Sequence, residues 1–119
     1  MAHFDEYMQA HRARREAAAA EAVARALEAR AAAVAAAQRL GERLGVCRVV
    51  LFGSLARGRF HERSDIDLAV EGLPPGKLTD AMAIAEEGSH FQFGIVPLEA
   101  AFDYISAAVG REGIQLWPR

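Results

Sequence analysis

Two aspartates on alternate residues, Asp65 and Asp67, follow the pair Gly53-Ser54 after an interval of ten residues. In the run "DIDLAVEG" acidic or small residues alternate with Ile, Leu and Val, which is the period of a strand with one apolar face. Both carboxylates are therefore expected on the same polar face, about 6.5 to 7 Å apart along the backbone. Two carboxylates this close repel each other unless a cation or a proton lies between them.

Oxygen ligands of this kind favour a hard cation such as Mg²⁺, which usually keeps several waters and completes its shell with substrate phosphates. The Gly53-Ser54 pair suits a phosphate, because glycine lets the backbone approach a ligand closely and the turn can offer N–H groups and a hydroxyl. Arginines in the interval can neutralise phosphate charge, Arg57 above all, with Arg59 and Arg63 as further candidates.

The pattern as a whole predicts nucleotidyl transfer. Asp65 and Asp67 are the candidate catalytic residues and metal ligands, and Gly53, Ser54 and Arg57 are the candidate nucleotide-binding residues. The aspartate pair is compatible with two metal ions about 3.5 to 4 Å apart, which would activate an attacking hydroxyl and stabilise the leaving group. The alternative is a regulatory domain in which the two aspartates only face solvent.

The composition is that of one ordered domain without a strong charge. The chain has 119 residues, 52% of them apolar and 25% charged, with a formal net charge of -2, which disfavours a general DNA-binding protein. A single cysteine, Cys47, excludes an internal disulfide and a multi-cysteine zinc site. No apolar run approaches the ~18 residues of a membrane span, and the N-terminus does not resemble a signal peptide. A cytoplasmic location is therefore expected.

An alanine-rich helix is expected over residues 5–44, since no proline interrupts this stretch. Val23, Leu27 and Val34 fall at helical spacing and are expected to pack on the domain. The first residues carry little bulky apolar content, so we divide the chain into a helical extension, 1–22, and a domain, 23–119. The extension is a candidate contact for a partner or for a homo-oligomer. This hypothesis would fail if deleting residues 1–20 left assembly and partner binding intact.

The rest of the chain predicts an α/β domain built on a small sheet. Strands are expected at "VCRVVLFG", where Cys47 should be buried, at "DIDLAVEG" and at "HFQFGIV". Helices are expected at "LTDAMAIAEEG" and from about Leu98 to Val109. Trp117 has two interpretations, a core residue or an exposed anchor at an interface.

These residues resemble the minimal nucleotidyltransferases of the DNA polymerase beta superfamily, whose hallmark is Gly-Ser, ten residues and Asp-x-Asp. The pairs Gly53-Ser54 and Asp65/Asp67 fit this hallmark without a gap. The resemblance covers roughly residues 24–116 and includes "GSLARG", "SDIDLAVEG" and a tail, "REGIQL", similar to the family's usual close.

The resemblance implies a mixed sheet with helices on one side and Mg²⁺-dependent transfer of AMP from ATP to a hydroxyl of a partner protein. It also implies pairing with an all-helical HEPN toxin. In such pairs the nucleotidyltransferase is the antitoxin, which masks the toxin or adds AMP units to one of its tyrosines. The choice of ATP rests on the resemblance alone.

The chain departs from the family at the third carboxylate, which lies on the third strand. The stretch "FQFGIVPLE" places Gly94 at that position. The missing group would help to hold the metal and deprotonate the incoming hydroxyl, so its loss should lower the rate more than nucleotide binding. Two hypotheses follow: an active enzyme that works with two aspartates, or a degenerate one that neutralises a toxin by contact.

Overall fold

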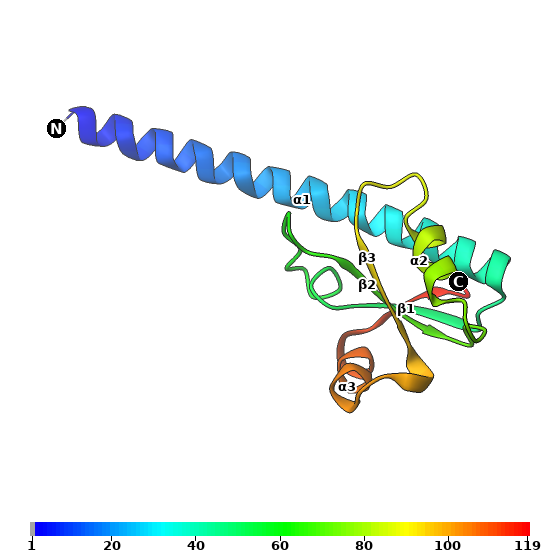
Figure 1. Cartoon of the computed structure of the whole chain (residues 1–119). Coiled ribbons are helices and arrows are strands. Elements are labelled where there is room, and N and C mark those ends of the chain that lie inside the picture. The colour runs from blue at the N-terminus through cyan, green and yellow to red at the C-terminus, as the bar shows by residue number, and fades with distance from the viewer. Residues whose placement is uncertain (1) are drawn as a thin grey trace.

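The computed structural model describes residues 2–119 (Figure 1). The elements in chain order are α1 (Ala2–Leu44), β1 (Arg48–Phe52), β2 (Ile66–Glu71), α2 (Leu78–Ala85), β3 (Phe93–Pro97), the short 3₁₀ helix η1 (Leu98–Ala100), α3 (Asp103–Glu112) and β4 (Ile114–Trp117). The expected class, an α/β fold with a small mixed sheet behind a long N-terminal helix, is confirmed.

The sheet has the strand order β3-β2-β1-β4. β1 is antiparallel to both β2 and β4, whereas β2 and β3 are parallel. α2 lies in the connection between the two parallel strands, as parallel pairing requires a crossover. Because β1 and β2 are central, the inner residues of each strand are paired on both sides, and Asp67 is one of them.

α1 packs on the sheet through small side chains. Its buried residues are Ala29, Ala33, Ala36, Ala37 and Leu40, at helical spacing. The prediction that larger apolar residues form this face is wrong for Val23 and Leu27, which are 61% and 65% exposed. Alanine lets the helix axis come close to the sheet, where a longer side chain would hold it away.

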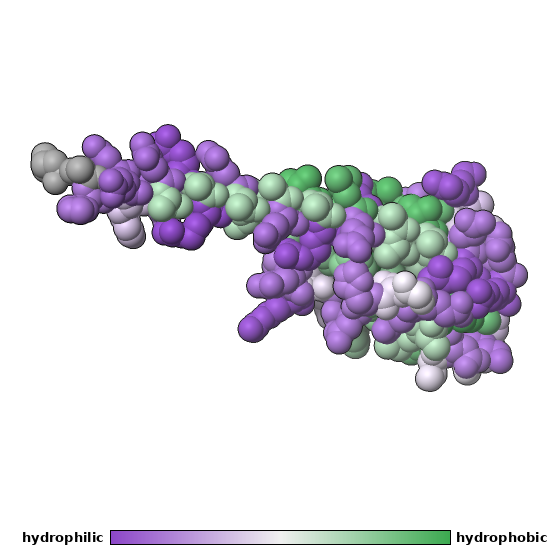
Figure 2. Space-filling view, turned by 90° about the horizontal axis from the view of Figure 1, so that it is seen from above, coloured by the Kyte–Doolittle hydropathy of each residue, from purple (hydrophilic) through white to green (hydrophobic). Residues whose placement is uncertain are grey.

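The N-terminal part of α1 extends beyond the body of the domain (Figure 1), which gives the molecule extents of 66 × 31 × 23 Å. Its side chains are exposed, including Phe4 and Tyr7. Figure 2 shows this part as mostly hydrophilic with a pale band of alanines, and apolar side chains gather where the helix meets the body. The division at residue 22 stays a prediction.

Helices cover both faces of the sheet. α1 and α2 lie over the face that carries Leu51, Leu68 and the other large core residues. The expectation of helices on one side only is therefore wrong, because a second apolar cluster on the other face is covered by α3. α3 packs against the opposite face, where Ile105 and Val109 contact a smaller cluster around Val50. The face of β2 that carries Asp67 is therefore bounded by α3.

Three local predictions differ from the structure. The stretch expected as a helix from Leu98 is instead η1 followed by α3, and β4 was not foreseen. Cys47 is exposed rather than buried, because it precedes β1.

Among residues 2–119, no helix combines the length and apolar character that crossing a lipid bilayer requires.

Trp117 packs at the edge of the core, against α1. A Cβ atom at Gly41 would lie 2.0 Å from the indole ring, so only glycine lets β4 and α1 meet at this distance. Trp117 is partly buried among the core residues, which decides between its two interpretations in favour of the core.

Gly41→Ala should destabilise the fold, although alanine is the better helix former. Overpacking against the indole should lower the free energy of unfolding by about 1–3 kcal/mol, measured by urea denaturation. Gly110→Ala in α3 is the matched control, since a Cβ atom there meets nothing within 4 Å, and it should stabilise by about 0.5–1 kcal/mol. Equal stability of the two variants would contradict the packing role of Gly41.

Candidate functional site

Asp65 and Asp67 lie at the start of β2, and the prediction that they share one face stays a prediction. Asp65 is exposed and directly precedes the strand, whereas Asp67 is half-buried within it. Asp67 is opposite Phe52 of β1 and Gly94 of β3. The central position of the strand thus fixes the backbone of the second aspartate from both sides.

Gly53 begins the turn after β1 and lies against Asp67. Its φ of +82° belongs to the region that favours glycine. A Cβ atom there would be 2.3 Å from Oδ2 of Asp67. The turn is closed by hydrogen bonds from the Arg57 amide to the Gly53 carbonyl (3.1 Å) and from the Arg59 amide to the Ser54 carbonyl (2.8 Å). The structure therefore brings the glycine turn and the aspartates together.

Glu112, at the end of α3, also belongs to this site and was not foreseen. The Gly53 amide donates to Oε2 of Glu112 at 2.7 Å, and Nη1 of Arg57 donates to the same oxygen at 3.1 Å. The Glu112 side chain is only 11% exposed. The available signal was the tail "REGIQL", which contains this glutamate but gave no hint of its long-range partners.

The electrostatics of the site are unbalanced toward negative charge. Burial, and next the Asp65 carboxylate, raise the pKa of Asp67 above its ordinary value of 3.8. The Arg57 guanidinium lowers the pKa of Asp67, and the Glu112 carboxylate raises it again. The negative charge of Asp67 is therefore unfavourable unless a proton neutralises it or a cation lies beside it.

Gly94 lies beside Asp67 on the neighbouring strand. A Cβ atom at Gly94 would be 3.0 Å from Oδ1 of Asp67, which is tighter than ordinary contact. No group of three or more histidine, cysteine or acidic residues that could hold a metal occurs within residues 2–119. The metal site expected at Asp65 and Asp67 stays a prediction. Two carboxylates would suit Mg²⁺, because this ion keeps waters and takes phosphate oxygens.

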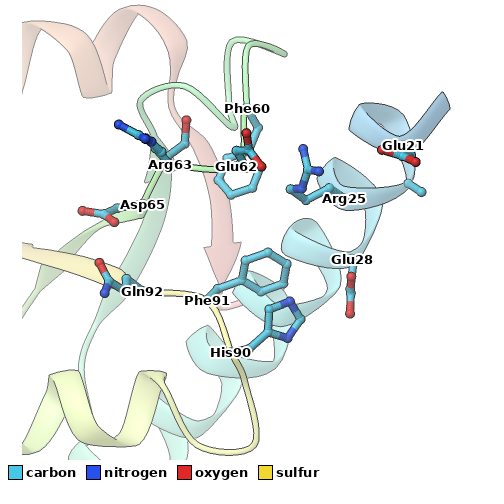
Figure 3. A pocket seen from close by; sticks show the side chains of 12 residues that line it. Glu21, Arg25, Glu28, Phe60, Glu62, Arg63, Asp65, His90, Phe91 and Gln92 are labelled. Atoms are coloured by element: carbon cyan, nitrogen blue, oxygen red, sulfur yellow. The ribbon is translucent and has the colours of Figure 1, made fainter. Parts of the chain in front are cut away.

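A pocket of about 660 Å³ adjoins Asp65 (Figure 3). Its aromatic side chains come from the β1–β2 loop and from the segment before β3, and α1 forms the remaining wall. Four carboxylates but only two guanidinium groups line it, from Glu21, Glu28, Glu62 and Asp65 against Arg25 and Arg63. A highly charged phosphate chain is therefore disfavoured inside this pocket.

Comparison with known proteins agrees with this geometry. The family model described as nucleotidyltransferase domain matches residues 35–95, just over half of the chain. The chain therefore belongs to the nucleotidyltransferase domain family, and the resemblance stated from its sequence is confirmed. No curated protein sequence matches it at a significant level.

Solved structures of toxin-antitoxin pairs share the fold. One, described as a toxin-antitoxin with AMP-PNP, is 26% identical over 69% of each chain, with a TM-score of 0.61. Another is an MntA-HpeT pair in which two aspartates are changed to glutamate, at 23% identity, 69% coverage of each chain and a TM-score of 0.61. A tyrosine-to-alanine mutant of MntA-HpeT is 24% identical over 69% and 68% of the two chains, with a TM-score of 0.58. The last two show the fold alone.

Asp67→Asn should stabilise the metal-free protein at pH 7. Because folding raises the pKa of Asp67, the folded state binds more protons than the unfolded state, so wild-type stability falls as pH rises above the ordinary value of 3.8. The melting temperature of the variant should therefore exceed that of the wild type at pH 7, and the difference should shrink toward pH 3.

Calorimetry over this pH range measures the effect, with Asp5→Asn on the exposed part of α1 as a control for the change in net charge. A variant that is less stable than the wild type at pH 7 would contradict the unfavourable charge at Asp67.

Proposed function

We propose that the protein is a Mg²⁺-dependent nucleotidyltransferase that transfers AMP from ATP to a hydroxyl of a partner protein. The observation that supports this most is the close approach of Asp67 to the Gly53 turn, where burial, and next the nearby Asp65 carboxylate, raise the pKa of Asp67. This arrangement places two carboxylates beside a backbone turn and a guanidinium, the groups that a metal-bound triphosphate requires.

Each residue has a role in this proposal. Asp65 and Asp67 hold Mg²⁺, which neutralises phosphate charge and makes an acceptor hydroxyl easier to deprotonate. The Gly53 turn, the Ser54 hydroxyl and Arg57 bind the phosphates. The acceptor oxygen forms a bond to the α-phosphorus, the bond from this phosphorus to the bridging oxygen breaks, and pyrophosphate leaves while the hydroxyl proton passes to solvent.

The pocket beside Asp65 is the proposed entrance for the acceptor. Its excess of carboxylates disfavours the triphosphate, and its aromatic side chains, Phe60 and Phe91, offer an apolar surface to a protein side chain (Figure 3). The partner is proposed to be an all-helical HEPN toxin, because the structural relatives are toxin-antitoxin pairs and one of them is described with AMP-PNP. The protein would then be the antitoxin and act in the cytoplasm, with the exposed part of α1 as a further contact.

Masking of the toxin by contact, without chemistry, is the second candidate function. Gly94 favours it, because the register opposite Asp67 offers no carboxylate to deprotonate the acceptor. Under this alternative the protein retains nucleotide affinity or only the fold, and neutralisation requires only the surface.

Titration calorimetry with Mg-ATP tests the binding part of the proposal. The wild type should bind, and Asp67→Asn should bind at least about tenfold more weakly, which corresponds to about 1.4 kcal/mol. Asp80→Asn on α2, outside the site, should bind as the wild type does. Equal affinity of the wild type and Asp67→Asn would argue against a metal-bound nucleotide at this strand.

Transfer of label from ATP labelled at the α-phosphate to a co-purified partner distinguishes the two functions. If the third carboxylate limits the rate, Gly94→Asp should increase transfer at least about tenfold, since a positioned base contributes 10² to 10⁴. Gly110→Asp, at an open position of α3, should leave the rate unchanged. Absence of transfer by the wild type and by Gly94→Asp, with toxin neutralisation intact, would favour masking.

A further inference from the structure

Glu112 is held beside the glycine turn by the connection between α3 and β4. It is the last residue of α3, and the Gly113 amide donates to the Val109 carbonyl at 2.9 Å. A Cβ atom at Gly113 would lie 2.6 Å from Cγ1 of Val50 in β1. The connection between α3 and β4 therefore lies on β1 (Figure 1), and the contact of Gly113 with Val50 fixes the backbone next to Glu112.

The Glu112 carboxylate occupies the donors that would bind a phosphate. Its Oε2 accepts hydrogen bonds from the Gly53 amide and from Arg57, a backbone N–H and a guanidinium. Phosphate oxygens are bound in proteins by these same two kinds of donor. The Gly53 amide has a single hydrogen, so a carboxylate and a phosphate oxygen cannot both accept it at full strength.

We propose that Glu112 is an internal anion that competes with the phosphates of the nucleotide for Gly53 and Arg57, so that binding requires its displacement. This inference rests on the proposed function, in which the phosphates bind at this turn. Displacement needs only rotation of the side chain, because Gly113 keeps the backbone in place. Nη2 of Arg111 already lies 3.8 Å from Oε1 of Glu112 and can keep the displaced carboxylate paired at the surface.

Competition makes a prediction that other roles of Glu112 do not. A glutamate that merely held the turn in shape, or that served as a metal ligand, would leave binding weaker when its charge is removed. A competing anion has the opposite effect, since its removal frees both donors for phosphate. The sign of the change in affinity therefore decides between these roles.

The test uses Glu112→Gln in the full-length protein, with Mg-ATP and with inorganic triphosphate as probes in titration calorimetry. The amide oxygen of glutamine can still accept from Gly53, so the fold is retained while the charge is lost. The dissociation constant of both probes should fall roughly three- to tenfold, because the lost contact is a charge-assisted hydrogen bond. An unchanged or larger dissociation constant would overturn the proposal.

The matched control is Glu99→Gln. Oε2 of Glu99 accepts from the Gly72 amide at 2.8 Å, and Gly72 has the same φ of +82° as Gly53. This contact lies beyond the other end of β2 and changes the net charge equally when it is neutralised. Affinity should not change in this variant. Equal tightening in both variants would show a general charge effect and would overturn local competition.

A second measurement needs no variant. When inorganic triphosphate is added to the ¹⁵N-labelled wild type, the amide resonances of Arg111 and Gly113 should shift together with that of Gly53, since displacement frees the Glu112 side chain. A shift of the Gly53 resonance alone would overturn displacement.

Failure of label transfer despite tighter binding of Glu112→Gln would contradict the proposed function and leave this inference standing. Transfer with unchanged affinity of that variant would contradict this inference alone.

Discussion

The carboxylate of Asp67 lies between two glycines, and this close approach sets the geometry of the site. A side chain at Gly53 would meet one carboxylate oxygen at 2.3 Å, and a side chain at Gly94 would meet the other at 3.0 Å. Gly53 follows β1 and Gly94 lies in β3, on the two sides of the central strand β2. A side chain does not fit at Gly53, whereas one at Gly94 would require only a small shift of Asp67. The two glycines thus leave room for the Asp67 carboxylate between β1 and β3, next to the turn that begins at Gly53.

The same arrangement concentrates negative charge. Burial of Asp67 and the carboxylates of Asp65 and Glu112 raise the pKa of Asp67, and these effects prevail over the Arg57 guanidinium, which pairs with Glu112 and lowers this pKa. A fold built only for stability would avoid such a cluster, because like charges oppose one another more strongly where water is excluded. Clusters of this kind are typical of sites that bind a cation or a proton, where stability is sacrificed for function.

The sequence predicted those parts of the molecule that depend on local periodicity. The strand around Asp67 and the turn at Gly53 follow from alternation and from glycine chemistry, and both lie as expected. The prediction of which α1 residues pack on the sheet was wrong. Burial of alanine depends on how closely the helix approaches the sheet and not on the spacing of large apolar residues along the helix. Glu112 was missed because its partner Gly53 is 59 residues away, and nothing in the residues around either one indicates the other.

Glu112 and Gly94 act on different free energies, that of nucleotide binding and that of the transition state. Glu112 accepts hydrogen bonds from the two donors that we propose for the phosphates, so in this proposal it opposes nucleotide binding and affects the ground state. Gly94 lacks the carboxylate that would act on the acceptor hydroxyl, so this position affects the transition state after binding. A protein that lost only the group acting on the transition state could still bind nucleotide and respond to it. Binding and chemistry can therefore have separated in this chain, with the nucleotide controlling the position of Glu112 at the end of α3 even where transfer is slow.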